Sequence, residues 1–191
     1  AVAGSSGQVL GGGGGGVWLQ ATTATLDHVT IANNKISGTG TVGQGLLLIN
    51  TTDTGSNATV RNSLITGHNG TDGSAIDVFP KSTVTLAGGL LYGNKWNTSR
   101  DNPNMGTNVG TVNGAQTMGS ADPLYIATAD NDFHIQSKSP ARDKAAGSQQ
   151  TIDVDNEQRD NTPDYGADEA GGEPQGLPKG RVLLYLPRLA R

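Results

Sequence analysis

Alternating acidic residues in the last third of the chain are the first candidates for chemistry. Asp153, Asp155 and Glu157 occupy every second position, so on a strand their carboxylates would lie on one face. Oxygen ligands of this kind suit Ca²⁺, although the spacing does not match an EF-hand loop. Calcium binding is therefore one hypothesis for these three acids. Ion pairing with Arg159 and Arg142 is the other hypothesis, and it is the simpler one.

The histidines and the other charged residues do not form a pattern typical of catalysis. His28, His68 and His134 are far apart in the sequence and lack the spacing of metal ligands, so we expect ladder or surface positions for them. Glycoside hydrolysis needs two facing carboxylates, and the repeats described next offer no such pair. The charged residues considered there, at non-equivalent places, include Asp27, Asp77, Lys35, Arg61 and Lys81. We predict no catalytic residues and do not expect an enzyme.

A nine-residue block that occurs three times indicates which elements position these side chains. The copies are residues 26–34, 60–68 and 86–94, and they superpose without gaps. A short apolar segment precedes each copy, at residues 17–19, 46–49 and 76–79. The equivalent positions are Thr25, Thr59 and Thr85 just before the block, Ile31, Ile65 and Leu91 in its sixth place, and Asn34, His68 and Asn94 at its end.

The repeats predict a parallel β-solenoid built from short strands and turns. No repeat has enough apolar residues to bury a face alone, so each must stack on a neighbour. Parallel stacking places like residues over like, which suits the threonine and the aliphatic positions. The polar residues that end the blocks would form a hydrogen-bonded turn ladder. An antiparallel sandwich of short strands is the alternative.

Composition narrows the class of protein further. The chain has 191 residues, 29 of them glycine, with 4% aromatic and 16% charged residues, which favours tight turns and a thin core. A net charge of −4 argues against a nucleic-acid surface, which needs clustered Lys and Arg. No run approaches the ~20 apolar residues of a membrane span. Cysteine is absent, so neither disulfides nor thiolate metal sites are expected.

Short motifs after residue 120 carry a resemblance to a known family. They read D-P-L at 122–124, D-F-H-I-Q at 132–136, S-P-A-R-D at 139–143, D-V-D-N-E-Q-R at 153–159 and P-D-Y-G-A-D-E at 163–169. Together with the glycine run at 11–16 and the blocks, this order resembles bacterial secreted right-handed parallel β-helix proteins. Their kinds are pectate-lyase-like, polymorphic-outer-membrane-protein-like and choice-of-anchor surface proteins. The resemblance spans residues 11–169.

The resemblance implies a secreted or cell-surface protein with a right-handed, single-stranded parallel β-helix. It implies no single activity, because one scaffold carries many functions. Lyases of this family use Ca²⁺-binding acids and a basic residue that abstracts a proton, and the repeats show no such cluster. The expected fold class is therefore an all-β parallel β-helix with irregular C-terminal coils and a terminal extension strand.

Four segments are expected along the chain. Residues 1–16 form a glycine-rich segment, 17–169 the β-helix domain, 170–180 a linker and 181–191 a hydrophobic strand. The last segment is similar to short endings of exported proteins of the phylum Chloroflexota, where a sorting role is suspected. We expect its strand to pair with the next copy, as in donor-strand addition. The strand consists of Val182, Leu183, Leu184, Tyr185 and Leu186.

Two functions from different classes follow from the sequence. The favoured one is an extracellular structural or adhesive surface protein that assembles head to tail with copies of itself. The alternative is a carbohydrate-active module, either a lyase-like enzyme or a glycan-binding surface. Calcium is the only cofactor considered, and glycans or a cell surface are the further partners. Sequons for N-glycosylation lie at Asn50, Asn57, Asn69 and Asn97.

Overall fold

The computed structural model describes residues 15–35, 43–70, 73–171 and 173–174 of the chain. Within these ranges the protein is built from strands and contains no α-helix. The helical turns there are three short 3-10 helices, Pro103–Met105, Ala115–Thr117 and Thr128–Asp130. No helix in the described ranges is long and apolar enough to cross a membrane.

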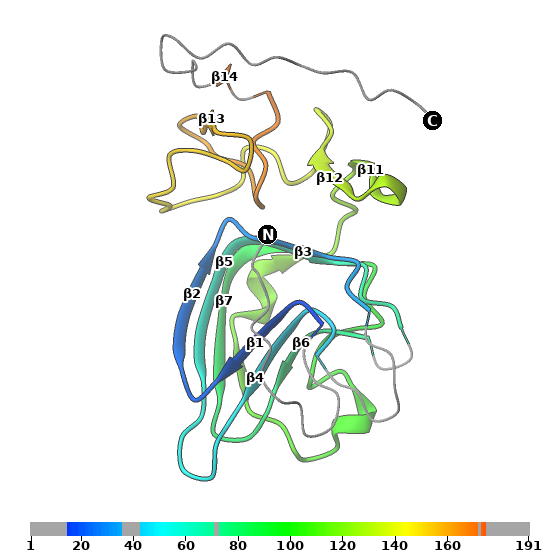
Figure 1. The fold of residues 1–191 in the computed structure, drawn as a ribbon, viewed down its shortest axis with the longest axis vertical. Coiled ribbons are helices and arrows are strands. Elements are labelled where there is room, and N and C mark those ends of the chain that lie inside the picture. The colour runs from blue at the N-terminus through cyan, green and yellow to red at the C-terminus, as the bar shows by residue number, and fades with distance from the viewer. Residues whose placement is uncertain (1–14, 36–42, 71–72, 172, 175–191) are drawn as a thin grey trace, which may run out of the picture.

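Two parallel sheets form the body of the molecule (Figure 1). The first sheet has four strands in the order β1 (Val17–Gln20), β4 (Leu46–Ile49), β6 (Ser74–Val78) and β8 (Trp96–Thr98). The second sheet has six strands, centred on the ten-residue strands β5 (Asn57–Thr66) and β7 (Thr83–Tyr92). On one side of that pair lie β2 (Thr23–Asp27) and β3 (Thr30–Ala32), and on the other lie β9 (Thr111–Asn113) and β10 (Met118–Gly119).

Strand pairing in the second sheet follows the register of the repeated blocks. Thr25 pairs with Thr59, and Thr59 pairs with Thr85, all in parallel. In the same way Ile65 lies between Ile31 and Leu91. These are the pairs expected when the blocks are superposed, because parallel strands place equivalent residues side by side and like aliphatic side chains pack well.

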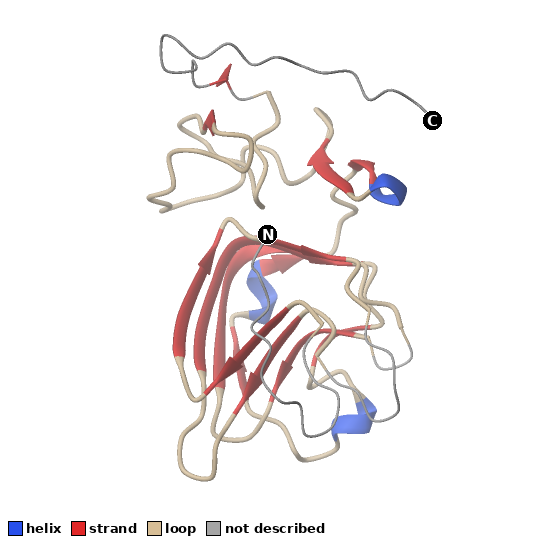
Figure 2. Cartoon of the chain, in the orientation of Figure 1, coloured by secondary structure: helices blue, strands red, loops and turns tan. Residues whose placement is uncertain are grey.

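The hydrophobic core lies between the two sheets. Leu46, Leu48 and Ile76 from the first sheet are fully buried against Val60 and Ile65 from the second. Burying one such side chain stabilises the fold by about 1.5–3 kcal/mol. The sheets therefore hold together through their facing aliphatic rows, and the turns that join them lie outside this core (Figure 2).

A row of left-handed residues bends the second sheet at equivalent positions. His28, Asn62 and Gly88 have φ angles of 52°, 52° and 84°. They follow Asp27, Arg61 and Ala87, which occupy one register position. Glycine and asparagine tolerate this backbone conformation best. The bend explains why β2 and β3 are separate strands although both pair with β5.

The C-terminal part, residues 121–171 and 173–174, is mostly irregular and contains antiparallel pairs. Strand β11 (Tyr125–Ala127) pairs with β12 (Asp132–Ile135), and β13 (Glu157–Gln158) pairs with β14 (Glu173–Pro174). This part lies at one end of the parallel body (Figure 1). A second apolar cluster joins the two, with Leu64 and Leu90 of the body packed together with Ile135 and Ala141.

The predicted fold class is wrong. The sequence predicts one right-handed parallel β-helix over residues 17–169, whereas parallel pairing ends at Gly119 and the strands that follow pair antiparallel. The physical reason is that residues 121–169 lack the paired apolar segments that each further layer would need to bury. In the described part of the chain there are instead two parallel sheets and two small antiparallel pairs. The predicted extension strand, Val182–Leu186, lies outside the described residues, and β14 falls within the predicted linker.

Candidate functional site

A cleft of about 590 Å³ separates the parallel body from the C-terminal part. Residues 29–32, which include all of β3, form one wall. Phe133 and His134 of β12, together with Val154, Asp155 and Asp168 of the C-terminal loops, form the other. We call this feature the β3 cleft. It brings His134, Asp155 and Asp168 next to β3, so it is the candidate site.

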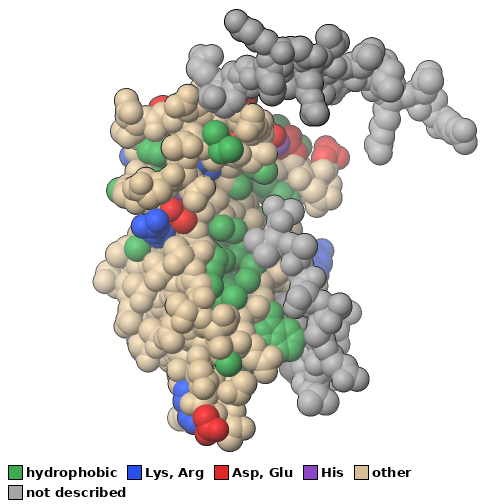
Figure 3. Space-filling model, turned by 60° about the vertical axis from the view of Figure 1, so that its left-hand side comes forward, with side chains coloured by type: hydrophobic (Ala, Val, Ile, Leu, Met, Phe, Trp, Pro, Cys, Tyr) green, Lys and Arg blue, Asp and Glu red, His purple; other side chains and the backbone are tan. Residues whose placement is uncertain are grey.

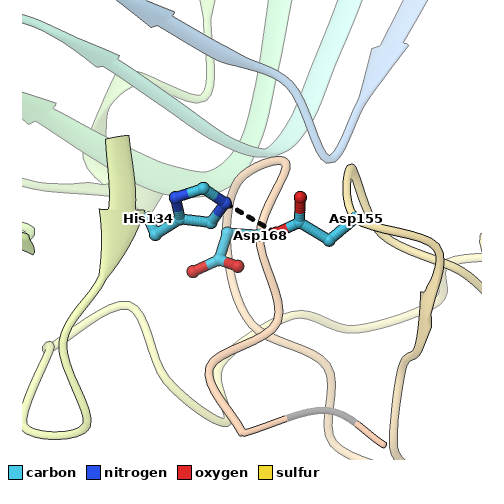
Figure 4. Close-up of side chains that lie close together, drawn as sticks. All are labelled: His134, Asp155 and Asp168. Atoms are coloured by element: carbon cyan, nitrogen blue, oxygen red, sulfur yellow. Dashed lines mark hydrogen bonds and ion pairs between the residues drawn. The ribbon is translucent and has the colours of Figure 1, made fainter. Parts of the chain in front are cut away.

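His134 faces Asp155 at this cleft, and Asp168 lies beside the pair (Figure 4). Its Nδ1 bonds to Asp132 Oδ1 on the same strand, and its Nε2 bonds to Asp155 Oδ2 at 2.6 Å. These bonds, first the one to Asp132 and then the one to Asp155, raise the pKa of His134 to about 9. The imidazole is therefore protonated at neutral pH. Both ring nitrogens are engaged, so neither offers a free lone pair to a substrate.

Asp168 completes the group from a buried position. Its Oδ2 accepts a hydrogen bond from the backbone N–H of Ile135 at 2.7 Å, and burial raises the pKa of its carboxyl group. One ligand atom each from His134, Asp155 and Asp168 lie within 4.8 Å of one another. Such a set could hold a divalent cation if His134 lost its proton. In the arrangement seen here the three side chains instead connect β12 to two C-terminal loops.

The three acids predicted as a calcium site do not converge. Asp153 Oδ1 accepts from the backbone N–H groups of Asp155 and Glu157 at 2.9 and 2.7 Å, and its Oδ2 accepts from Glu169 N at 3.1 Å. Asp153 is thus a turn-forming acceptor, and Asp155 faces His134. Burial, followed by the nearby carboxylate of Asp153, raises the pKa of Glu157. Their alternation in sequence therefore reflects a turn and not a strand face.

Arg159 is a buried clamp for the loop of residues 164–169. Its side chain donates to Gly166 O at 2.9 Å, to Ala167 O at 2.8 Å and to Glu169 Oε2 at 3.1 Å. An arginine fork suits several acceptors at once, and charge-assisted bonds are the stronger ones. Arg159 thus forms its ion pair with Glu169, whereas the sequence suggests Asp153, Asp155 or Glu157 as its partner. Arg142 instead donates to the carbonyl of Ser137 at 3.1 Å.

The polar residues that end the blocks hydrogen-bond in series. Asn34 Nδ2 lies 3.4 Å from His68 Nε2, and His68 Nδ1 lies 3.0 Å from Asn94 Oδ1. Asn94 Nδ2 also donates to Ile65 O at 2.9 Å. Desolvation lowers the pKa of the fully buried His68 to about 4. A neutral imidazole, donating from one nitrogen and accepting at the other, fits between the two asparagines.

The four predicted glycosylation sites lie apart from the β3 cleft. Asn57 and Asn69 are exposed, whereas Asn50 and Asn97 are half-buried. Asn50 donates to Thr51 O, and Asn97 Oδ1 accepts from Asn94 at 3.4 Å. The predicted assembly residues, Val182–Leu186, lie outside the described residues.

Sequence reasoning missed the role of His134 and the presence of Asp168 at the site. Their contacts join residues 21 and 33 positions apart, through His134 to Asp155 and through Ile135 to Asp168. No spacing rule covers such separations. The available signal was the position of both residues inside the D-F-H-I-Q and P-D-Y-G-A-D-E motifs.

Comparisons of the chain with protein-family models, with curated proteins and with solved structures give no match. The function is therefore argued from the fold and from the contacts of its side chains.

Proposed function

We propose that this chain is an extracellular structural protein of a cell surface, which assembles head to tail with copies of itself. One observation carries the proposal: the parallel body has open edges on both sides. Within the described ranges β1, β2 and β3 each pair on one side only, and so do β8, β9 and β10. Unpaired strand edges invite another strand. If residues 182–186 of one copy add to such an edge of the next copy, the contact is heterologous and can repeat as a filament.

The use of polar side chains supports a structural role over a catalytic one. His134 is held by two carboxylates, Arg159 by backbone carbonyls and Glu169, and His68 by two asparagines. Such satisfied networks rigidify a protein and specify one arrangement. A general base needs a free acceptor within reach of its substrate, and His134 has both nitrogens engaged.

The extracellular location is inferred from the resemblance of residues 11–169 to secreted surface proteins. An adhesive role belongs to the same proposal, with a cell surface or its glycans as the partner. No observation favours the carbohydrate-active alternative. Lys95 Nζ lies 4.3 Å from the centre of the Trp96 ring, so a cation already occupies a face on which a sugar could stack.

Light scattering after size-exclusion chromatography tests the proposal. The full chain is expected to form polymers larger than a dimer, and a chain that ends at residue 180 is expected to stay monomeric. The truncated chain keeps every described contact, because these lie within residues 15–174. Leu184→Asp in the full chain is the control for the truncation, because it adds a charge to the terminal strand without shortening the chain. A full chain that remains monomeric at high concentration would overturn the proposal.

A further inference from the structure

The β3 cleft follows the free edge of a strand. Residues 29–32 line it without interruption. Because the side chains of a strand alternate between two faces, four consecutive residues can line one cleft only if the cleft runs along the strand edge. The β3 cleft is therefore a groove beside an edge, and the backbone of β3 forms part of its wall.

The backbone groups on that edge have no ladder partner in the described ranges. Val29 O accepts from Leu64 N at 2.9 Å, so Val29 faces β5. In a parallel ladder every second residue bonds to the same neighbour. Ile31 is thus the next residue to face β5, and the N–H and C=O groups of Thr30 and Ala32 point toward the cleft. They form a template for one more strand.

The walls of the groove combine apolar and acidic side chains. Val17, Phe133 and Val154 provide apolar surface, and Asp155 and Asp168 provide carboxylates next to the protonated His134. Apolar side chains also gather on the face of the parallel body shown in Figure 3, below the C-terminal part. A groove of this kind suits an extended segment that is apolar and carries basic groups at its ends.

The chain contains one segment with this chemistry. Residues 182–186 are five consecutive apolar residues, Val-Leu-Leu-Tyr-Leu. Residues 175–191 include no acid, and their basic residues are Lys179, Arg181, Arg188 and Arg191. Five residues in a strand span about 16 Å, a typical strand length. Pro187 follows and would end the pairing.

We infer that the β3 cleft is the acceptor site for residues Val182–Leu186 of a neighbouring copy, which add as a strand to the free edge of β3. The inference rests on the proposed self-assembly and names the surface on which it occurs. The flanking arginines then face the acidic wall of the groove. The donor is a neighbouring copy, as the proposed self-assembly requires. β14, the last described strand, pairs with β13, which closely follows Val154 and Asp155 of the cleft wall, so docking within one chain is the outcome that the test must separate.

Cysteine cross-linking tests this pairing directly, because the natural chain contains no cysteine. One full-length variant carries Val154→Cys in the wall of the cleft, where Val154 is 58% exposed. A second carries Tyr185→Cys in the terminal segment. The two are mixed and oxidised mildly, and the mixed disulfide is measured by mass spectrometry. Thr52→Cys, exposed in the loop before β5 and outside the cleft, replaces Val154→Cys in the matched control.

The inference predicts at least a tenfold higher yield of the mixed disulfide for Val154→Cys than for Thr52→Cys. Adding Ala32→Pro, which removes one edge N–H, is expected to lower that yield. If polymers form but the two yields are equal, the acceptor site is wrong while self-assembly stands. A chain with both Val154→Cys and Tyr185→Cys that closes on itself at high dilution shows self-docking and overturns the inference. A full chain that forms no polymers refutes the proposed function as well.

Discussion

At the scale of single residues, two histidines illustrate how environment decides charge. His68 is fully buried between Asn34 and Asn94, and desolvation keeps it neutral by lowering its pKa to about 4. His134 lies between Asp132 and Asp155, whose hydrogen bonds raise its pKa to about 9. The His68 imidazole is therefore neutral and part of the asparagine ladder, whereas the His134 imidazole is a cation between two carboxylates. Their effects on stability have opposite pH dependence.

Acid is expected to destabilise the protein through His68. Its pKa in the folded state, about 4, lies below the value of ~6.5 in the unfolded chain. Its contribution is thus fully present above pH ~6.5, and it is lost as the pH falls toward about 4, by about 3 kcal/mol in total. Denaturant titrations at pH 7.5 and 4.5 measure this loss.

His68→Asn is the informative variant for the same measurement. Asparagine continues the ladder with Asn34 and Asn94 but does not titrate, so the loss of stability between pH 7.5 and 4.5 should shrink. Part of the loss should remain, because burial also lowers the pKa of His28. An unchanged pH dependence in His68→Asn would show that His68 is not the titrating group.

Alkali is expected to weaken the hydrogen bonds of His134 to Asp132 and Asp155. A pKa raised from ~6.5 to about 9 means that its contribution is fully present below pH ~6.5 and is lost as the pH rises through about 9. The side chain is 39% exposed, so solvent screens the effect and the total loss is small. NMR titration of the ring protons measures the pKa directly. Asp132→Asn should lower the pKa of His134. A midpoint near 6.5 in the natural chain would contradict its hydrogen bonds to the two carboxylates.

At the scale of elements, the repeated blocks explain the pairing of the second sheet, and the irregular C-terminal part shows where sequence reasoning ends. Ile31, Ile65 and Leu91 occupy the sixth position of the three blocks and lie side by side, because parallel strands in register pair equivalent positions. The loops after residue 120 have no such repeat. They are held by side chains that hydrogen-bond to nearby backbone groups, such as those of Asp153 and Arg159, and such contacts do not repeat along the sequence.

Ile65→Asp tests the inside of the middle strand. Ile65 is fully buried in β5 between two aliphatic neighbours, so the substitution places a charge in the core and should cost several kcal/mol. Thermal unfolding followed by circular dichroism should show loss of the folded state. Asn57→Asp, at the exposed start of the same strand, is the control and should be nearly neutral. Equal tolerance of the two changes would contradict the assigned faces of β5.

At the scale of the whole molecule, the sequence predicts strand content and register better than it predicts the fold class or the site. The error came from extending the stack to residue 169 on the strength of motifs that belong to the C-terminal part. The cluster of His134, Asp155 and Asp168 was missed because these side chains meet only after β12 packs against loops that are distant in the sequence. The sequence does show the repeated blocks of the parallel body and the basic, apolar terminal segment. The unpaired edges of the body are seen only in the structure.

The mass distribution of the full chain is the most direct test of head-to-tail assembly. Native mass spectrometry over a concentration series should give a ladder of integer multiples of 19.5 kDa for the full chain, odd multiples included. The chain that ends at residue 180 should give its monomer alone. Unless it closes into a ring, a heterologous contact leaves a free donor and a free acceptor at the two ends of each oligomer, so the ladder of an open filament should extend with concentration. A full chain that gives only a monomer, or a dimer that never grows, would contradict the account.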